Sequence, residues 1–316
     1  MQVSNSDRVV FPDISRTKGD VVDYYARVAS RALPHVLERP LSIRRYPKGL
    51  SAPGFFQKNV PAHYPESIER FPMPRSRESS KRHRDPEARE RNVTVYPVVS
   101  QPEQLAYLAN QGAIELHVPG VRIVRLDRPD RIVLDLDPKP GALALVQRAA
   151  LIVRDALGER GLPTVPVATG SKGYHLVAAI RPELDMETLG LTLHKFAELL
   201  ARAHPEELTT AFRIANRGER VFIDWLRNHA LATVVVPYSL RARPRATVAT
   251  PLIWSELETT APDAFNIDDV PRLLDRPDSL AELAERPVDP APFVAAVEAE
   301  FERSGLELEP FDRFRS

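Results

Sequence analysis

The chain has no cysteine, no long apolar run and no net charge. The absence of cysteine excludes disulfide bonds, thiolate zinc sites and cysteine nucleophiles. No apolar stretch approaches the roughly 18 residues that a membrane-spanning helix needs. The amino-terminal residues have neither the basic start nor the apolar core of a signal peptide. These absences predict a soluble, cytoplasmic protein that does not contact a membrane.

The balanced charge conceals an asymmetry along the chain. Residues 255–316 contain 16 acidic residues against 6 arginines and no lysine, so this segment is strongly acidic and the remainder is correspondingly basic. The basic remainder of the chain is compatible with binding to nucleic acid, because such binding depends on the local positive field rather than on the net charge of the protein. The alternative is that both sets of charges only keep the surface solvated.

The hydrophobic patterns predict an α+β (mixed α/β) fold in a single domain over residues 1–316. Strand patterns and helical patterns alternate without a steady βαβ rhythm, which favours a mostly antiparallel or mixed sheet flanked by helices. Residues 74–91 hold seven lysines or arginines and four acids and predict an exposed loop, and residues 255–316 predict an acidic helical segment. Residues 41–60 look irregular or hairpin-like. Strands are expected at residues 93–99, 114–118, 121–126, 131–137, 164–168, 174–180, 221–225 and 231–237, and helices at 20–37, 102–111, 143–160 and 186–203.

Two acids, Asp135 and Asp137, end an apolar run. In a strand they project from one face about 7 Å apart and repel by about 2 kcal/mol at an effective dielectric constant of about 20. A divalent cation reverses that repulsion. Carboxylates select hard ions such as Mg²⁺ or Mn²⁺, and a pair of such ions serves phosphoryl transfer. The alternative is a pair of solvent-facing acids at the end of a strand.

A polar segment at residues 171–175 follows the acids. If a strand begins near Lys172, then Ser171, Gly173 and His175 share a face that suits phosphate oxygens, and Lys172 adds positive charge. The segment is not a Walker loop. Taken alone, Ser-Lys-Gly is more often an ordinary turn.

A third acid, Asp224, lies in the apolar run at residues 221–225. An unpaired charge is costly to bury there, so Asp224 needs a partner. The partner is either Arg217 or Arg220 just upstream in a simple ion pair, or a metal ion shared with Asp135 and Asp137.

In order and spacing, these three segments resemble the signature segments of the archaeo-eukaryotic primase superfamily. More narrowly, the chain resembles the polymerase domain of bacterial ATP-dependent DNA ligase D, over about residues 7–260. Residues 17–25, 54–58, 115–119 and 237–241 agree with the same family. The resemblance implies a primase-like catalytic core, a two-metal site that holds Mn²⁺ or Mg²⁺, and NTP or dNTP substrates.

The resemblance also assigns roles to individual residues. The metal ligands and catalytic acids would be Asp135, Asp137 and Asp224. The incoming nucleotide would be bound by Ser171, Lys172, Gly173, His175, His117, Arg217 and Arg241. The DNA would be contacted by Arg8, Lys18, Phe55, Phe56 and Lys58. Within this set, Lys18 and Arg8 match the residues that bind a downstream 5′-phosphate, although a lysine is usual where Arg8 stands.

The function implied by the family is a template-directed, metal-dependent nucleotidyltransferase, a DNA polymerase or primase. It would add nucleotides, preferentially ribonucleotides, to a 3′-hydroxyl at short gaps or double-strand breaks, in non-homologous end joining or in gap-filling excision repair. The expected partners are gapped or broken duplex DNA with a 5′-phosphate, a separate ATP-dependent DNA ligase and the end-binding protein Ku. We expect a monomer, in the bacterial cytoplasm and at the nucleoid during repair.

Three other functions share parts of this pattern. A primase that starts chains de novo has every motif, and a non-catalytic module that bridges DNA ends would use the basic body without the acids. A haloacid-dehalogenase-like phosphatase also has an Asp-x-Asp motif at the end of an apolar run. In that class the motif is followed by threonine or valine near the amino terminus, whereas Pro138 follows it here.

Overall fold

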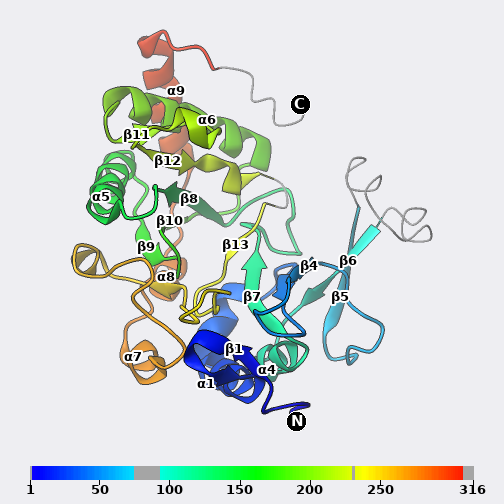
Figure 1. The fold of residues 1–316 in the computed structure, drawn as a ribbon. Helices are drawn as coiled ribbons and strands as arrows, with labels where there is room; N and C mark the ends of the chain where they lie inside the picture. Colours follow the sequence, from blue (N-terminus) through cyan, green and yellow to red (C-terminus); the bar gives the residue numbers. More distant parts are fainter. Residues whose placement is uncertain (1, 75–92, 230–231, 309–316) are drawn as a thin grey trace. The chain divides into compact units, whose positions relative to one another are not determined.

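The computed structural model describes residues 2–74, 93–229 and 232–308, and Figure 1 shows their fold. The chain forms two compact units, each made of segments that are far apart in the sequence. Unit 1 is Met1–Val124, Thr233–Thr250 and Asp263–Pro277, and unit 2 is Arg125–Ala232, Pro251–Pro262 and Asp278–Ser316. Helices accompany sheets in both units, so the predicted mixed α+β class is confirmed. The charged loop expected at residues 74–91 lies outside the described residues except for Pro74.

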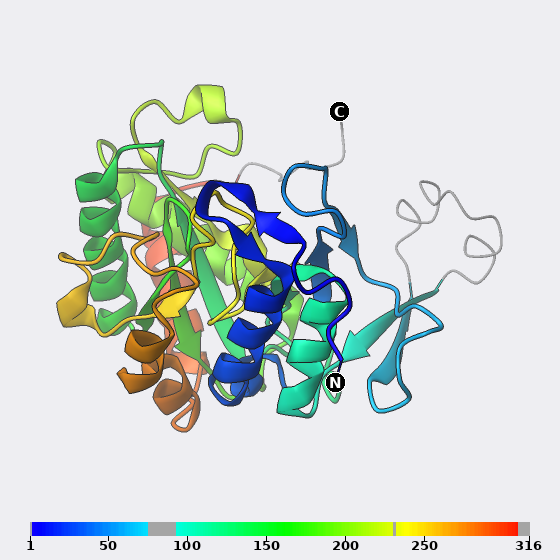
Figure 2. The ribbon, with the colours of Figure 1, turned by 60° about the horizontal axis from the view of Figure 1, so that its bottom comes forward.

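Unit 1 contains a four-stranded sheet whose neighbouring strands are all antiparallel. Two helices, α1 and α4, pack side by side in this unit (Figure 2). The strands of the sheet are, in order, β13 (Val234–Val235), β7 (Ala113–Val118), β3 (Ser42–Arg45) and β4 (Phe55–Gln57). The other elements are the antiparallel pairs β1 (Val9–Phe11) with β2 (Arg16–Thr17) and β5 (Glu69–Pro74) with β6 (Val93–Val98), and the helices η1 (Pro12–Ile14), α1 (Lys18–Val36), α4 (Pro102–Asn110) and α7 (Val270–Asp275).

Helix α1 begins two residues earlier than the sequence pattern indicated, because a capping box fixes its start. The Thr17 hydroxyl accepts from the Asp20 backbone N–H, and the Asp20 carboxylate accepts from the Thr17 N–H at 2.7 Å. Pro34 lies in the last turn without ending the helix, and the Leu37 N–H still donates to the Leu33 carbonyl. The helix therefore presents one continuous buried face to unit 1.

Unit 2 is built on a mixed, mostly antiparallel sheet. Its central strand β8 is antiparallel to both neighbours, β12 and β10, and the short β11 runs parallel to β12. The strand order is β11 (Leu208–Thr209), β12 (Val221–Asp224), β8 (Arg131–Asp137), β10 (Tyr174–Ala179), β9 (Val165–Ala168) and β14 (Thr250–Pro251). This arrangement confirms the antiparallel or mixed sheet expected from the sequence.

Helices pack against this sheet in unit 2. Helix α5 contacts β8, β10 and β12, and it ends next to Gly161, which adopts the positive φ of 78° that glycine tolerates. Helix α6 contacts β11, η3 and α9. The helices are α5 (Leu143–Glu159), α6 (Met186–Ala203), α8 (Ser279–Ala284) and α9 (Ala291–Ser304), with the 3₁₀ segments η2 (Ile214–Asn216), η3 (Trp225–Asn228) and η4 (Trp254–Glu256).

Two expected strands differ from the structure. Residues 121–126 form no continuous strand: Ile123 and Val124 lie in a turn between two single bridge residues, the Ile123 N–H donates to the Glu38 carbonyl, and Val124 is 70% exposed. The strand expected at residues 231–237 is limited to Val234–Val235. The hairpin-like expectation for residues 41–60 is confirmed by the antiparallel pair of β3 and β4.

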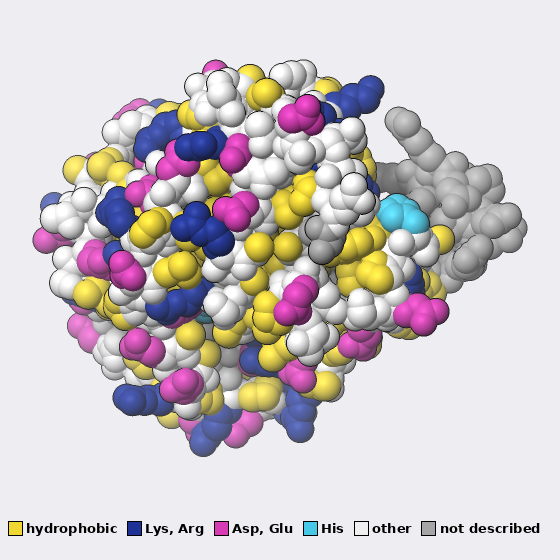
Figure 3. All heavy atoms as spheres, turned by 90° about the horizontal axis from the view of Figure 1, so that it is seen from below, with side chains coloured by type: hydrophobic (Ala, Val, Ile, Leu, Met, Phe, Trp, Pro, Cys, Tyr) yellow, Lys and Arg dark blue, Asp and Glu magenta, His cyan; other side chains and the backbone are white. Residues whose placement is uncertain are grey.

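Part of the acidic carboxyl-terminal segment is paired to basic side chains within unit 2. Glu298 and Glu300 of α9 form ion pairs with Lys195 of α6 and with Arg160. On the face drawn in Figure 3, basic and acidic side chains are interspersed with apolar ones. No helix among the described residues is long and apolar enough to span a membrane.

Candidate active site

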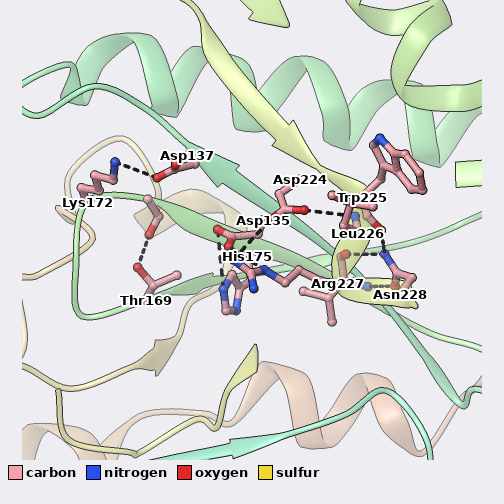
Figure 4. A network of polar contacts seen from close by, with 12 residues as sticks. Asp135, Asp137, Thr169, Lys172, His175, Asp224, Trp225, Leu226, Arg227 and Asn228 are labelled. Carbon is pink, nitrogen blue, oxygen red and sulfur yellow. Dashed lines mark hydrogen bonds and ion pairs between the residues drawn. The ribbon is translucent and has the colours of Figure 1, made fainter. Parts of the chain in front are cut away.

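The ends of three adjacent strands in unit 2 bring polar side chains together (Figure 4). Asp135 on the central strand β8 lies directly opposite Asp224 on β12 and directly opposite His175 on β10. Residues opposite one another in an antiparallel pair point to the same face, so these side chains form a row across three strands. Asp137 lies two residues further along β8, on the same face. The structure therefore brings together the three acids that the sequence pattern selected.

Arg227 bridges two of these carboxylates. Its Nε is 3.2 Å from Asp135 Oδ2 and its Nη2 is 3.1 Å from Asp224 Oδ2. The alternative weighed from the sequence, a simple ion pair of Asp224 with Arg217 or Arg220, is not the pair that the structure shows. The reason is that β12 ends at Asp224 and continues into the 3₁₀ segment η3, which turns a residue three positions downstream back towards it. That i to i+3 spacing was the available signal for Arg227.

Asp137 lies between two other cations. Arg217 Nη1 is 2.8 Å from Asp137 Oδ2, and Lys172 Nζ is 2.9 Å from Asp137 Oδ1. The guanidinium of Arg217 also lies 4.0 Å from the centroid of the Phe222 ring and donates to the Ala211 carbonyl. These contacts hold Arg217 beside β12, and its ion pair with Asp137 makes it part of the site.

The surroundings of Asp224 disfavour its ionised form. Burial raises the pKa of Asp224 to about 6; the charge of Arg227 opposes this effect and the charge of Asp135 reinforces it. The Leu226 backbone N–H donates to Asp224 Oδ1 at 3.1 Å and favours the ionised form. A positive charge added near Asp135 and Asp224 would therefore stabilise the ionised site.

The donor set suits a hard divalent cation. Three carboxylates on one face of adjacent strands are the oxygen ligands that Mg²⁺ and Mn²⁺ prefer, and a cation would offset the burial that, with the charge of Asp135, raises the pKa of Asp224. With the side chains as they lie, no group of three or more His, Cys, Asp or Glu residues among those described is arranged to hold a metal ion. Arg227, Arg217 and Lys172 contact the carboxylates instead.

The segment before β10 is a bend rather than the start of a strand. Strand β10 begins at Tyr174, so Ser171 and Gly173 do not share a strand face with His175 as the sequence reasoning supposed. The bend is closed by Thr169, whose backbone N–H and hydroxyl both donate to the Gly173 carbonyl, at 3.2 and 2.6 Å. Lys172, in the middle of the bend, is thereby held near Asp137.

Gly173 is required by a close approach of the bend to β8. A Cβ placed on Gly173 would lie 2.0 Å from the Leu136 carbonyl oxygen, well inside any tolerated contact. Only glycine lets the chain pass this near the strand that bears Asp135 and Asp137.

A second polar cluster lies in unit 1 and contains two of the residues expected to bind nucleotide, His117 and Arg241. Both surround the buried carboxylate of Glu115: His117 Nε2 is 3.0 Å from Glu115 Oε2, and Arg241 Nε is 3.6 Å from Oε1. The Phe56 ring packs edge-on against His117, with centroids 5.5 Å apart. The expected nucleotide-binding residues are thus distributed over both units, with His117 and Arg241 in unit 1 and the others in unit 2.

The residues expected to contact DNA all belong to unit 1. Phe55 and Phe56 on β4 are 48% and 57% exposed, and Lys58 is exposed. Lys18 is buried, and its Nζ donates to the carbonyl and to the hydroxyl of Ser4, both at 2.7 Å. Burial, with the charge of Arg8, lowers the pKa of Lys18. The Lys18 N–H donates to the Arg8 carbonyl, so this basic pair is adjacent.

Comparison with known proteins gives a consistent result. The family model described as LigD, primase-polymerase domain, matches residues 17–280. The multifunctional non-homologous end joining protein LigD of Mycobacterium bovis is 34% identical over 300 residues, which cover 90% of this chain and 38% of that protein. The bifunctional non-homologous end joining protein LigD of Bacillus subtilis is 32% identical over 274 residues, covering 85% of this chain and 42% of that protein. The chain therefore spans less than half the length of these relatives.

A solved structure agrees with the sequence comparisons. The polymerase domain from Mycobacterium tuberculosis ligase D in complex with DNA matches with a TM-score of 0.79 and 32% identity, over 91% of this chain and 99% of that chain. This likeness confirms the primase-like fold that the sequence motifs implied.

Proposed function

Because the chain belongs to the LigD primase-polymerase domain family, and so to the nucleotidyltransferases, we propose that it is a template-directed DNA repair polymerase of non-homologous end joining. It would extend a 3′-hydroxyl at short gaps or breaks, preferring ribonucleotides. The observation that supports this most directly is the row formed by Asp224, Asp135 and His175 across three strands, with Asp137 beside it.

The reaction is the attack of a primer 3′-hydroxyl on the α-phosphate of a nucleoside triphosphate, which forms a phosphodiester and releases pyrophosphate. Asp135, Asp137 and Asp224 would hold Mn²⁺ or Mg²⁺, which supplies charge neutralisation and activates the hydroxyl. Lys172 and Arg217 already neutralise Asp137, and both present N–H donors that suit phosphate oxygens.

The remaining nucleotide contacts follow from the bend at residues 171–173. Ser171 and the backbone N–H groups of the bend would donate to phosphate oxygens, and Gly173 allows the bend to lie close to β8. His175 Nε2 is 3.7 Å from Asp135 Oδ1 and would add a donor next to the acids. In unit 1, His117 and Arg241 are the further residues that the family resemblance assigns to nucleotide binding.

The DNA substrate is proposed to be a gapped or broken duplex with a 5′-phosphate. The solved relative is in complex with DNA. In this chain the exposed rings of Phe55 and Phe56 suit stacking on a templating base, since every base has a π-face. Arg8 and Lys18 would bind the 5′-phosphate, with Lys58 on the duplex backbone. A DNA ligase activity would seal the product, and Ku would present the ends.

The test is primer extension on a gapped duplex that carries a 5′-phosphate, with Mn²⁺ or Mg²⁺ and with NTPs or dNTPs. Asp137→Ala should abolish extension, whereas Asp155→Ala, which removes an exposed acid of α5 paired with Arg154, should leave extension unchanged. Extension by Asp137→Ala at the wild-type rate would refute the assignment of the site. An unprimed template tests for a primase, because dinucleotide products would show de novo initiation.

A further inference from the structure

The carboxylate of Glu115 is buried at the centre of the polar cluster in unit 1. Its side chain is 3% exposed, and it accepts from two groups: His117 Nε2 at 3.0 Å and the Ala242 backbone N–H at 2.9 Å. Two guanidinium groups lie slightly further away, with Arg44 Nη1 at 3.5 Å and Arg241 Nε at 3.6 Å. The carboxylate of Glu115 is therefore contacted by groups from three segments: β3, strand β7 to which Glu115 itself belongs, and the segment after β13.

The backbone around Arg241 is independently fixed. Tyr238 adopts a left-handed conformation with φ of 65°, which is unfavourable for a non-glycine residue. Two buried hydroxyls from α1 hold this turn: Tyr24 donates to the Tyr238 carbonyl at 2.9 Å, and Tyr25 accepts from the Leu240 N–H at 3.1 Å. The turn that presents Arg241 is thus fastened to α1 on one side and to Glu115 on the other.

Strand β7 is fastened to the same turn. The Ser239 hydroxyl accepts from the Leu116 N–H at 2.9 Å, and the Tyr25 hydroxyl donates to the Ile114 carbonyl at 2.6 Å. Because Leu116 is the residue before His117, the backbones that present His117 and Arg241 are held in one hydrogen-bonded unit. Glu115 is the charged group that lies between the two side chains.

We propose that Glu115 is a positioning residue: it holds His117 and Arg241 in one fixed arrangement, ready to bind a nucleoside triphosphate. This proposal rests on the proposed function, in which both residues bind the incoming nucleotide. The His117 ring uses one nitrogen on Glu115, which fixes the ring orientation and leaves the other nitrogen for the substrate. The guanidinium of Arg241 is attracted to the same carboxylate through Nε, so Glu115 also orients this phosphate-binding group.

The contacts require a carboxylate rather than an amide. Glu115 faces donors from every side, namely His117, Arg241, Arg44 and the Ala242 N–H, and a glutamine would direct its own NH₂ group at one of them. Burial alone would raise the pKa of Glu115, but the hydrogen bond from His117, the charge of Arg241 and the Ala242 N–H together lower it to about 2. The group is therefore ionised throughout the range in which polymerases work.

The experiment is a double-mutant cycle on nucleotide use with Glu115→Gln, His117→Ala and the double variant. Each single variant should raise KM for the NTP about tenfold while kcat changes little, and the double variant should fall well short of the product of the two single effects, because Glu115 acts partly through His117 and partly through Arg241. A product of the two single effects, about a hundredfold, would show that Glu115 does not act through His117. Glu38→Gln, which alters a half-exposed carboxylate of unit 1 paired with Arg122, is the matched control and should keep the wild-type KM.

A second measurement separates positioning from a merely structural role. Burial lowers the pKa of His117 and the hydrogen bond that His117 donates to Glu115 opposes this effect, while Arg241 and Arg44 lower it further. Titration of the His117 imidazole by NMR should therefore show a lower pKa in Glu115→Gln, and an unchanged pKa would overturn the proposal. If Glu115→Gln fails to fold by circular dichroism, Glu115→Asp, which keeps the charge but shortens its reach, replaces it in both measurements.

The two proposals fail in distinguishable ways. If the wild-type protein does not extend a primer, the proposed function fails, and the His117 titration still decides whether Glu115 acts on its neighbour. If the wild type extends and Glu115→Gln has the wild-type KM, the function stands and the positioning role is refuted.

Discussion

Replacing Gly173 with alanine tests whether the bend before β10 must lie against β8. The new Cβ would be 2.0 Å from the Leu136 carbonyl oxygen and 3.1 Å from its carbon, whereas ordinary contacts begin at 3.4 Å. Both atoms belong to the backbone of the central strand β8, so relief of the clash requires the bend to move. The displacement needed is on the order of 1 Å, and it carries Lys172 away from its position 2.9 Å from Asp137.

The expected magnitudes differ for stability and for activity. Overpacking of this kind typically costs about 1–3 kcal/mol of unfolding free energy, and in units of this size each kcal/mol lowers Tm by about 2–4 °C. A misplacement of about 1 Å in a group that positions substrate lowers kcat/KM by about a hundredfold. We therefore expect Gly173→Ala to remain folded at 25 °C and to lose nearly all of its extension activity.

The assay compares Gly173→Ala with Gly158→Ala by thermal denaturation and by single-nucleotide primer extension. Gly158 lies near the end of α5 in the same unit, and a Cβ there meets nothing within 4 Å. Alanine at that position should therefore leave activity unchanged and stabilise the helix by up to about 1 kcal/mol. Wild-type extension by Gly173→Ala would refute the close-approach argument.

The remaining predictions concern the stability of unit 1. The pKa of Glu115 is lowered from 4.5 to about 2, so its contribution to stability is fully present above pH 4.5 and is lost as the pH falls towards 2. Urea unfolding should show that the wild type loses about 2 kcal/mol of unfolding free energy between pH 7 and pH 3. Glu115→Gln should not show this loss. An equal loss in both proteins would contradict this. Tyr25→Phe removes the hydroxyl that pairs the Ile114 carbonyl and the Leu240 N–H, and should lower the unfolding free energy by about 2 kcal/mol. Tyr107→Phe is the comparison, since this half-buried hydroxyl has no hydrogen bond within the described part of the chain, and a similar loss there would argue against the assignment.

The individual strands of the candidate site could be predicted from the sequence, because each is a short apolar run that ends in an acid, a pattern typical of a buried strand. The side-by-side placement of Asp224 and Asp135 could not, since alternation fixes the face of a strand but not its neighbour. The family resemblance supplied that adjacency in advance. Strand β12 borders β8 although more than eighty residues separate Asp135 from Asp224 in the sequence.

The errors in the sequence reading have physical causes. Residues 121–126 have the composition of a strand, but a strand needs a partner, and the Ile123 N–H bonds to the Glu38 carbonyl instead. Arg227 was missed because its approach to Asp224 depends on the turn of η3 after the strand ends.

The register of β12 against β8 fixes the position of Asp224 and of the fluorescent side chain that follows it, Trp225. Asp224 faces the carboxylates, while the next residue, Trp225, is 4% exposed and stacks on His194 of α6, with ring centroids 4.1 Å apart and planes 13° from parallel. A slip of one residue would exchange the two side chains, directing the indole at the acids and the carboxylate at the histidine ring. The fluorescence of Trp225 during refolding therefore reports whether the acids have reached their places, before any nucleotide or DNA is added.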